Sequence, residues 1–380
     1  MTRVLFLVSH LAGSGHLVRI LALARAVTAA GAVARVVSGG RPLGHIGRAG
    51  VDLVQIPPLA VRDLDFSRLL APDGEPADAA FMATRGAAIA AAIHAFRPDA
   101  LVTETFPLGR RSLAAEFEAA ISAARRVVPR VAVLASVRDV PEPPSAPDRL
   151  AAAADRLRTL YDRLIVHGDA GFLPLSATWP LPADLAAMTA HAGYVAEPAA
   201  PAEAPAPDGE VLVSAGGGDR GRGLLSMAAQ AAKGSRLRWR LLVGGADAAT
   251  EASALAARYP APNLAVEPAR ADYRARLARA AVSVSLAGYN TVTDLAPLAT
   301  PAILVPDETA GEREQAIRAA ALAGLPGVAV RPLAGLAPGD LAALAEAMAG
   351  RPRPPLPLAL DGAARAAVLI LETARRKAAA

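Results

Sequence analysis

Short runs of apolar residues alternate with longer, alanine-rich runs along almost the whole of this 380-residue chain. A strand followed by an amphipathic helix and another strand is typical of a parallel sheet with helices on its faces. In the first half we expect strands at residues 3–9, 33–38, 51–56, 100–103, 131–135 and 163–167, the last of which closes the sheet. Residues 17–30 carry apolar side chains at helical spacing. The predicted fold class is α/β.

A proline-rich segment interrupts this alternation and marks a domain boundary. Proline recurs every few residues within 199–209, which indicates an extended linker. Beyond it we expect strands at 211–214, 239–243, 264–267, 282–285 and 302–305. The predicted domains are two Rossmann-like halves at 1–198 and 210–360, with a helix at 361–380 that can pack back on the first half. Ligands of such sheets bind beyond the carboxyl ends of the strands, so we expect the site in a cleft between the halves.

Composition excludes several classes of function. The absence of cysteine rules out disulfides and thiolate metal sites and fits a reducing cytoplasm. The formal charge of +5 comes almost entirely from arginine, and no basic run with interleaved aromatic residues occurs, so nucleic acid is not an expected partner. No charge-free apolar run of about 18 residues predicts a membrane span, and the first ten residues are typical of a strand rather than a signal peptide. We expect a cytoplasmic protein, for which peripheral contact with the inner face of the cytoplasmic membrane stays open.

The first strand leads into a glycine-containing turn that precedes a helix. Gly13 and Gly15 let a ligand approach the backbone, and the amides of a helix N-terminus suit an anion. The turn does not match a dinucleotide fingerprint, because Val18 stands where a small residue is needed and no acidic residue ends the second strand. This disfavours a dehydrogenase. A tight turn capped by His16 is the structural alternative.

A second glycine segment, Gly216 to Gly218, lies directly between a strand and a helix. Its successive amides stand at the positive end of the helix dipole, and Arg220 and Arg222 can add charge-assisted contacts to a diphosphate. The segment lacks the lysine of a P-loop, so an ATPase is not predicted. A glycine-rich turn with solvated arginines is the alternative interpretation.

Two further segments of the second half place polar side chains after strands. Asp294 lies one turn into a predicted helix, where its carboxylate can accept two hydrogen bonds from ribose hydroxyls or complement the helix dipole. Glu314 and Gln315 begin the helix that follows Pro306 and can contact sugar hydroxyls. Each feature alone is weak evidence for a donor site, and the order of these features along the chain is more specific than any one of them.

That order resembles the GT-B fold, in which two Rossmann-like domains face each other across a cleft. More narrowly, it is similar to glycosyltransferase family 28, which includes the transferase that adds N-acetylglucosamine to lipid-linked muramyl pentapeptide. A closer resemblance is to a bacterial family of predicted glycosyltransferases. Its landmarks span nearly the whole chain, at residues 9–19, 103–111, 136–139, 161–169 and 193–195. The resemblance implies the fold and the reaction class.

The resemblance also implies a nucleotide-diphosphate sugar, with a UDP-sugar expected, and the residues that bind it. Gly216 to Gly218 would touch the phosphates, and Asp294 would take the ribose, where the lipid-linked transferase has a glutamate. Gln315 would contact the sugar, while Glu314 replaces the second glutamine usual there. Pyrimidine recognition would use backbone groups near Leu286. The other donor-side residues are Arg220, Arg222, Gly288, Asn290 and Thr291.

The expected reaction is a metal-independent transfer with inversion at the anomeric carbon, and no cofactor beyond the donor is implied. No Asp-x-Asp metal motif ends an expected strand, so the glycine-loop amides and arginines would stabilise the leaving diphosphate. Attack by an acceptor hydroxyl needs a base, for which His16 is the first candidate and Glu104 the second. An anionic or lipid-linked acceptor would meet Gly13, Gly15, Arg19, Arg110 and Arg138. Salt bridges within the domain explain the arginines equally well.

Two other functions stay open at this point. A UDP-sugar 2-epimerase shares the fold and donor but needs several carboxylates around the sugar, and Glu104 and Asp139 are too few to favour it. A nucleotide-sugar-binding subunit without chemistry needs no base, whereas His16 and the donor loop occur here in one chain.

Overall fold

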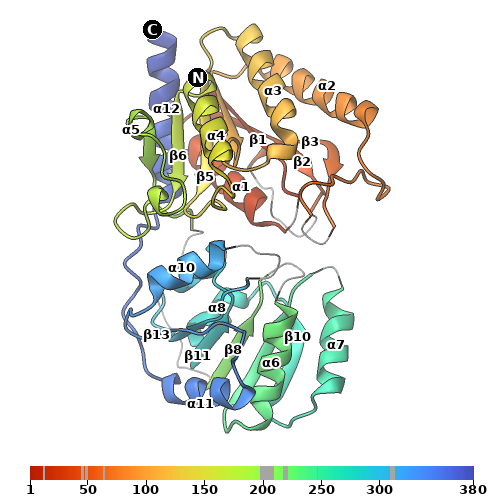
Figure 1. Ribbon diagram of the computed structural model, residues 1–380, viewed down its shortest axis with the longest axis vertical. Coiled ribbons are helices and arrows are strands. Elements are labelled where there is room, and N and C mark those ends of the chain that lie inside the picture. Colours follow the sequence, from red (N-terminus) through yellow and green to blue (C-terminus); the bar gives the residue numbers. More distant parts are fainter. Residues whose placement is uncertain are drawn as a thin grey trace. The chain divides into compact units, whose positions relative to one another are not determined.

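The structure is a computed structural model that describes residues 1–11, 13–43, 47, 50–62, 65–196, 209–216, 221–245, 247–308 and 313–380. The chain forms two compact units, unit 1 with residues 1–196 and 359–380 and unit 2 with residues 197–358 (Figure 1). Each unit has its own parallel sheet. The last helix, α12 (Gly362–Ala379), belongs to unit 1.

Unit 1 is built on seven parallel strands. They are β1 (Arg3–Val8), β2 (Val33–Gly40), β3 (Asp52–Leu59), β4 (Ala100–Glu104), β5 (Ala132–Arg138), β6 (Arg163–His167) and β7 (Thr189–His191). Their order across the sheet is β3-β2-β1-β4-β5-β6-β7. The prediction that the strand at 163–167 closes the sheet is wrong, because β7 pairs with β6 beyond it. β7 has three half-buried residues, too few to show the period-2 pattern of a strand.

Helices cover both faces of this sheet. Alternate residues of β1 point to opposite sides, so Val4 and Phe6 join a core with α1 and α12, whereas Leu5 and Leu7 join a core with α2, α3 and α4. The helices and 3₁₀ turns of unit 1 besides α12 are α1 (Gly15–Ala29), α2 (Ala79–Phe96), α3 (Ala114–Val127), α4 (Pro147–Leu160), α5 (Ala183–Ala186), η1 (Arg111–Leu113) and η2 (Leu175–Ala177). The unit is therefore a doubly wound α/β layer structure.

Helix α2 has the length and the mean hydropathy, 1.3, of a helix that crosses a membrane, and it alone has them among the described helices. Arg85 near its middle is fully buried, with Nε and Nη2 2.9 and 2.8 Å from the two carboxylate oxygens of Glu116 on α3. The guanidinium also donates to the carbonyl oxygen of Gly39 at the end of β2. This bidentate pair ties α2 to α3 and to the sheet, as expected of a helix in a layered domain.

Unit 2 contains six parallel strands in the order β10-β9-β8-β11-β12-β13. The strands are β8 (Glu210–Ser214), β9 (Arg238–Val243), β10 (Leu264–Pro268), β11 (Val282–Ser285), β12 (Ala302–Leu304) and β13 (Val328–Val330). The helices are α6 (Arg222–Lys233), α7 (Ala248–Arg258), α8 (Tyr273–Arg279), α9 (Tyr289–Leu295), α10 (Glu314–Leu322) and α11 (Pro338–Met348). Helices α6, α7 and α11 pack on the apolar face of β8 and β9. β13 was not predicted, because its three half-buried residues carry no periodic signal.

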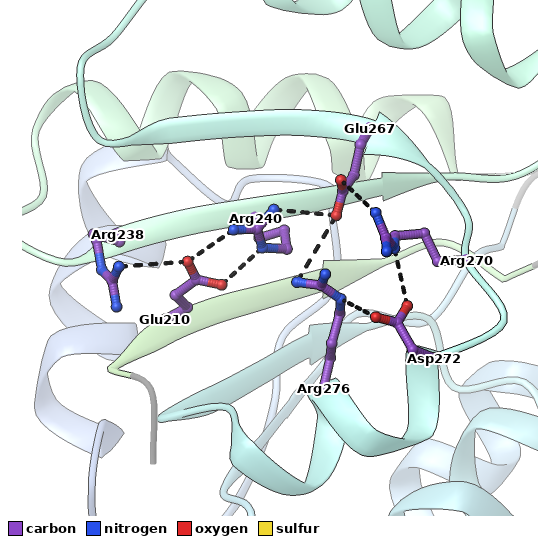
Figure 2. Close-up of polar contacts among 7 residues, drawn as sticks. All are labelled: Glu210, Arg238, Arg240, Glu267, Arg270, Asp272 and Arg276. Atoms are coloured by element: carbon purple, nitrogen blue, oxygen red, sulfur yellow. Dashed lines mark hydrogen bonds and ion pairs between the residues drawn. The ribbon is translucent and has the colours of Figure 1, made fainter. Parts of the chain in front are cut away.

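The opposite face of β8, β9 and β10 carries charges (Figure 2). Arg240 of β9 lies between two carboxylates, with Nε 2.8 Å from Oε2 of Glu210 and Nη1 3.1 Å from Oε1 of Glu267. Arg276 of α8 lies 4.0 Å from the same Glu267 and 3.0 Å from Asp272. These side chains stay partly exposed, so each pair contributes little alone and the network stabilises this sheet face as a whole.

The chain re-enters unit 1 through a close backbone contact. The amide of Tyr194 donates to the carbonyl oxygen of Ala359 over 2.7 Å, and the amide of Gly362 donates to that of Tyr194 over 3.0 Å. A Cβ on Gly362 would lie 2.2 Å from the carbonyl oxygen of Gly193, so a larger residue does not fit. These contacts hold the start of α12 against the segment that follows β7.

Each sheet has one point at which the strand order reverses. It lies between β1 and β4 in unit 1 and between β8 and β11 in unit 2. In open α/β sheets such a switch point is where ligands bind, beyond the carboxyl ends of the strands. The segments after these four strands are therefore where a site is expected.

Candidate active site

His16 and Glu104, the two candidate bases, are in contact at the switch point of unit 1. His16 is the second residue of α1, and Glu104 is the last residue of β4. Nδ1 of His16 lies 2.6 Å from Oε1 of Glu104, and the glutamate side chain is fully buried while the histidine side chain is 14% exposed. The two residues therefore form one imidazole–carboxylate pair.

Burial and neighbouring charges set the protonation states of this pair. Burial lowers the pKa of His16 to about 4, and the charge of Glu104 only partly offsets this effect. Burial acts in the opposite sense on Glu104, but His16, Arg19 and Arg110 outweigh it and hold the pKa of this carboxyl well below its usual value. At neutral pH the neutral imidazole donates its Nδ1 proton to the carboxylate. Nε2 then carries the lone pair that can accept a proton.

Arg19, predicted on the acceptor side, lies buried against the same carboxylate. Its Nη2 donates to Oε1 of Glu104 and lies 3.3 Å from Nδ1 of His16. The predicted glycines form the turn before these residues: Gly13 has a φ of +66°, a region that favours glycine, and Gly15 begins α1. Residues three positions apart lie on the same face of a helix, so the first turn of α1 presents both His16 and Arg19 to Glu104.

Arg110 lies in the segment that follows β4, and Arg138 ends the neighbouring strand β5. Arg110 has a φ of +57°, and its guanidinium carbon lies 5.7 Å from the centroid of the Phe66 ring. Its charge adds to burial in lowering the pKa of His16 and of His10. Arg138 is the half-buried last residue of β5. Both predicted arginines thus lie beyond the carboxyl ends of the strands, on the same side of the sheet as His16.

A second buried pair lies on β5 and β6. Nε2 of His167, the last residue of β6, is 2.7 Å from Oγ of Ser136, and both side chains are buried. Burial lowers the pKa of His167 to about 3, and the charge of Arg19 adds to this effect. Nδ1 of His167 has no hydrogen-bond partner in the described part of the chain. Both residues belong to the landmark segments 136–139 and 161–169, but nothing in the sequence predicts their contact across 31 positions.

The glycine segment at the switch point of unit 2 is described only at Gly216. This residue has a φ of +83°, and its amide donates to Oγ of Ser214 over 3.3 Å. Gly217, Gly218 and Arg220 lie outside the described residues. Gly216 thus adopts a left-handed conformation, which favours glycine.

Two predicted donor-side charges form ion pairs within unit 2. Arg222, the exposed first residue of α6, has Nε 3.3 Å from Oε2 of Glu251 on α7. Asp294 of α9 has Oδ1 2.7 Å from Nη2 of Arg274 on α8, and 12% of its side chain is exposed. Arg222 and Asp294 would therefore contact a nucleotide-sugar donor while they remain in these ion pairs.

The segment after β11 carries the remaining predicted donor residues. The Leu286 side chain is buried in the core of unit 2, so a ligand there would meet its backbone. Gly288 precedes α9, Asn290 is exposed and Thr291 is half-buried. The four residues thus follow one strand end at the switch point.

Gln315 joins the segments that follow β11 and β12. Its Oε1 accepts hydrogen bonds from the amides of Ala287 and Asp307, each over 3.1 Å. Because both partners are donors, the amide oxygen must face them, and the NH₂ group faces away. The neighbouring Glu314 forms an ion pair with the fully buried Arg318 over 2.7 Å and is therefore engaged within α10.

Comparisons with known proteins place the chain in a family. Residues 224–349 match the glycosyltransferase family 28 C-terminal domain. Over 356 residues, 83% of this chain and 91% of the relative, the chain is 32% identical to the UDP-N-acetylglucosamine–N-acetylmuramyl-(pentapeptide) pyrophosphoryl-undecaprenol N-acetylglucosamine transferase of Methylobacterium sp. (strain 4-46). The chain belongs to glycosyltransferase family 28. The transferase of the same name from Methylobacterium nodulans is 31% identical over 313 residues, 73% of this chain and 83% of the relative.

Solved structures share the fold of this family 28 glycosyltransferase. Acinetobacter baumannii MurG matches it with a TM-score of 0.60 at 17% identity, over 98% of this chain and 100% of that chain. Phytolacca americana UGT2, solved with UDP-2-fluoro-glucose and pterostilbene, matches with a TM-score of 0.60 at 14% identity, over 99% and 94% of the two chains. The predicted GT-B fold, family and enzyme class are confirmed.

Two arginines of this family 28 enzyme were not among the predicted site residues. Arg318 lies four positions after Glu314, a spacing that brings opposite charges together on a helix and could have revealed the pair. Arg274 lies 20 positions before Asp294 on a different helix, and no local pattern predicts their contact.

Proposed function

We propose that this glycosyltransferase moves a sugar from a UDP-sugar to an acceptor hydroxyl with inversion at the anomeric carbon, and that no divalent cation takes part. The observation that carries the proposal is the His16–Glu104 pair at the switch point of unit 1. A neutral imidazole with its Nδ1 proton bound by a buried carboxylate can take the acceptor proton at Nε2, because Glu104 compensates the imidazolium that forms. A single direct displacement by the activated hydroxyl inverts the anomeric centre.

Unit 2 is the proposed donor-binding unit. It contains the family 28 match, and the two relatives are named for UDP-N-acetylglucosamine as donor. Gln315 supports this role. Its Oε1 accepts hydrogen bonds from two backbone amides, so its NH₂ group points away from these amides and can donate to a sugar hydroxyl. Asp294 would bind the ribose, and the amides after Gly216 would take the charge of the leaving UDP in place of a metal.

The proposed acceptor is lipid-linked and anionic. The relatives are named for an acceptor with a pyrophosphoryl-undecaprenol group. Arg110 and Arg138, at the sheet edge that carries His16, are placed to attract such a diphosphate. We therefore place the enzyme in the cytoplasm, as a peripheral protein at the inner face of the membrane that holds this substrate.

A substrate panel tests the proposal. The protein is incubated with UDP-N-acetylglucosamine and other UDP- and dTDP-sugars, with and without undecaprenyl-diphosphate-linked acceptors. We expect acceptor-dependent release of nucleoside diphosphate, a product of inverted configuration by NMR, and a rate unchanged by EDTA. Donor binding without release would indicate a binding subunit, and formation of a 2-epimer without acceptor would indicate an epimerase. Loss of activity in EDTA would overturn metal independence.

A further inference from the structure

Arg19 lies one helical turn after His16 on α1 and is a buried arginine, with 4% of its surface exposed. Its Nη2 donates to the same carboxylate oxygen, Oε1 of Glu104, that accepts the Nδ1 proton of His16. The other oxygen, Oε2, is buried and has no hydrogen-bond partner among the residues described. The carboxylate is thus held through one oxygen, which an imidazole and a guanidinium share.

This geometry does not suit a contact between Arg19 and a substrate. An arginine that binds an acceptor presents its guanidinium to incoming ligand, whereas 3% of the Arg19 side chain is exposed and Glu104 compensates its charge. A buried cation in contact with a buried carboxylate instead orients the carboxylate and weakens its attraction for other protons.

We propose that Arg19 is a positioning residue of the transfer: it fixes Oε1 of Glu104 and weakens the hold of that oxygen on the proton of His16, so that Nε2 stays available as the base. The inference rests on the proposed role of His16. Without Arg19, the carboxylate would be a buried anion with no cation in contact, so the imidazolium would form at a higher pH than in the wild-type protein. A protonated His16 cannot take a proton from the acceptor hydroxyl.

The charged groups that face His16 come from three segments of unit 1. Glu104 ends β4, Arg110 lies in the turn after it, and Arg19 belongs to α1. Burial lowers the pKa of His16 most strongly, Glu104 raises it, and Arg110 and Arg19 lower it further. Arg19 is in direct contact with the shared oxygen, so its removal should act on both the charge and the geometry of the pair.

An NMR titration of the histidine Cε1–H resonances tests the inference without any substrate. The chain has six histidines, and His16→Gln identifies the resonance of His16. Arg19→Met, which removes the charge, should raise the pKa of His16 by about one unit or more. Arg19→Lys, which keeps the charge, should restore most of the wild-type value. The control Arg25→Met, at an exposed arginine of the same helix, should leave it unchanged.

The UDP-release assay gives a second readout. The acid limb of kcat/KM should move to higher pH in Arg19→Met by the same amount, while KM for the acceptor changes little. A folded Arg19→Met with an unmoved His16 pKa would overturn the inference, and so would a raised acceptor KM with an unmoved limb. Full activity of His16→Gln would instead defeat the proposed function, and the titration would still decide whether Arg19 controls His16.

Arg19→Met leaves Glu104 buried without this cation, which can prevent folding. The comparison then uses Glu104→Gln and the double variant Arg19→Met/Glu104→Gln, in which no buried carboxylate remains at this position. The pKa of His16 should again be higher in the variant without Arg19. Equal values in the two variants would contradict the inference.

Discussion

The two switch points of this enzyme share one topology and differ in chemistry. In each unit, a glycine with a positive φ, Gly13 or Gly216, follows the central strand, β1 or β8, and the partner strand across the switch point is β4 or β11. At the first point a partly buried imidazole and a buried guanidinium both contact one oxygen of a buried carboxylate. At the second, a glutamine carboxamide clamps two backbone amides, and a carboxylate is paired with an arginine.

We interpret this difference as a separation of proton transfer, in unit 1, from donor binding, in unit 2. The carboxyl end of the unit 1 sheet holds the buried His10 and His167 and the partly buried His16, all with a pKa lowered chiefly by burial. In unit 2 the acids Asp294, after β11, and Glu314, after β12, form ion pairs with arginines. Buried histidines with a shifted pKa are candidates for proton transfer, whereas fixed dipoles and paired charges suit a ligand that only needs to be held. The following predictions test that division.

The largest effect is expected at the proposed base. His16→Ala should lower kcat by about 10²–10⁴-fold, the usual contribution of a general base, while UDP affinity measured by calorimetry stays at the wild-type value. His94→Ala, at an exposed histidine of α2, is the matched control and should be silent. Wild-type turnover in His16→Ala would move the base elsewhere.

The pH profile should reflect the same residue. Because burial lowers the pKa of His16 to about 4, the imidazole stays neutral well below its usual range of protonation. The value of kcat/KM should therefore be flat through neutral pH and fall about tenfold per pH unit once the pH drops below that pKa. Circular dichroism at each pH shows whether the protein stays folded. A limb near pH 6.5 would indicate that His16 is solvated in the working enzyme.

Asp294→Ala should instead act on donor binding. Loss of the ribose contacts should weaken UDP affinity by about 1–3 kcal/mol, the scale of hydrogen bonds to a charged group, and leave the pH profile unmoved. Asp340→Ala, at an exposed position of α11, serves as the control. Unchanged UDP affinity would show that Asp294 serves its ion pair with Arg274 alone.

Variants of Gln315 can separate its two hydrogen bonds to backbone amides from its proposed contact with the donor sugar. Gln315→Ala leaves the amides of Ala287 and Asp307 without their acceptor and should lower the free energy of unfolding by about 1–3 kcal/mol. Gln315→Glu keeps an oxygen for both amides but loses the NH₂ group, so it should lose less stability and raise KM for the donor. A stable Gln315→Glu enzyme with an unchanged donor KM would exclude the sugar contact.

Sequence periodicity predicts most of the strands and both α/β halves, but it does not predict the side-chain contacts at the switch points. The two α/β halves and eleven of the strands follow from apolar runs, while β7 and β13 are too short to show a pattern. His16 and Glu104 were each selected by residue type and position after a strand, yet they are 88 positions apart. Only the placement of β1 beside β4 makes them a pair, and periodicity within a strand does not determine which strand lies next to it.

The smallest effect is expected at Arg222, and it tests whether unit 2 holds the diphosphate through side chains or mainly through backbone amides. Arg222 is 66% exposed and paired with Glu251, so Arg222→Ala should weaken UDP affinity by less than about 1 kcal/mol, as for a surface ion pair. Glu251→Ala is the matched variant, because it frees the guanidinium without removing it. If Arg222 leaves Glu251 to bind the donor, Glu251→Ala should tighten UDP binding and Arg222→Ala should weaken it strongly. Small changes in both variants would indicate that the backbone amides after Gly216, rather than Arg222, bind the diphosphate. Unit 2 would then hold the donor mainly through fixed dipoles.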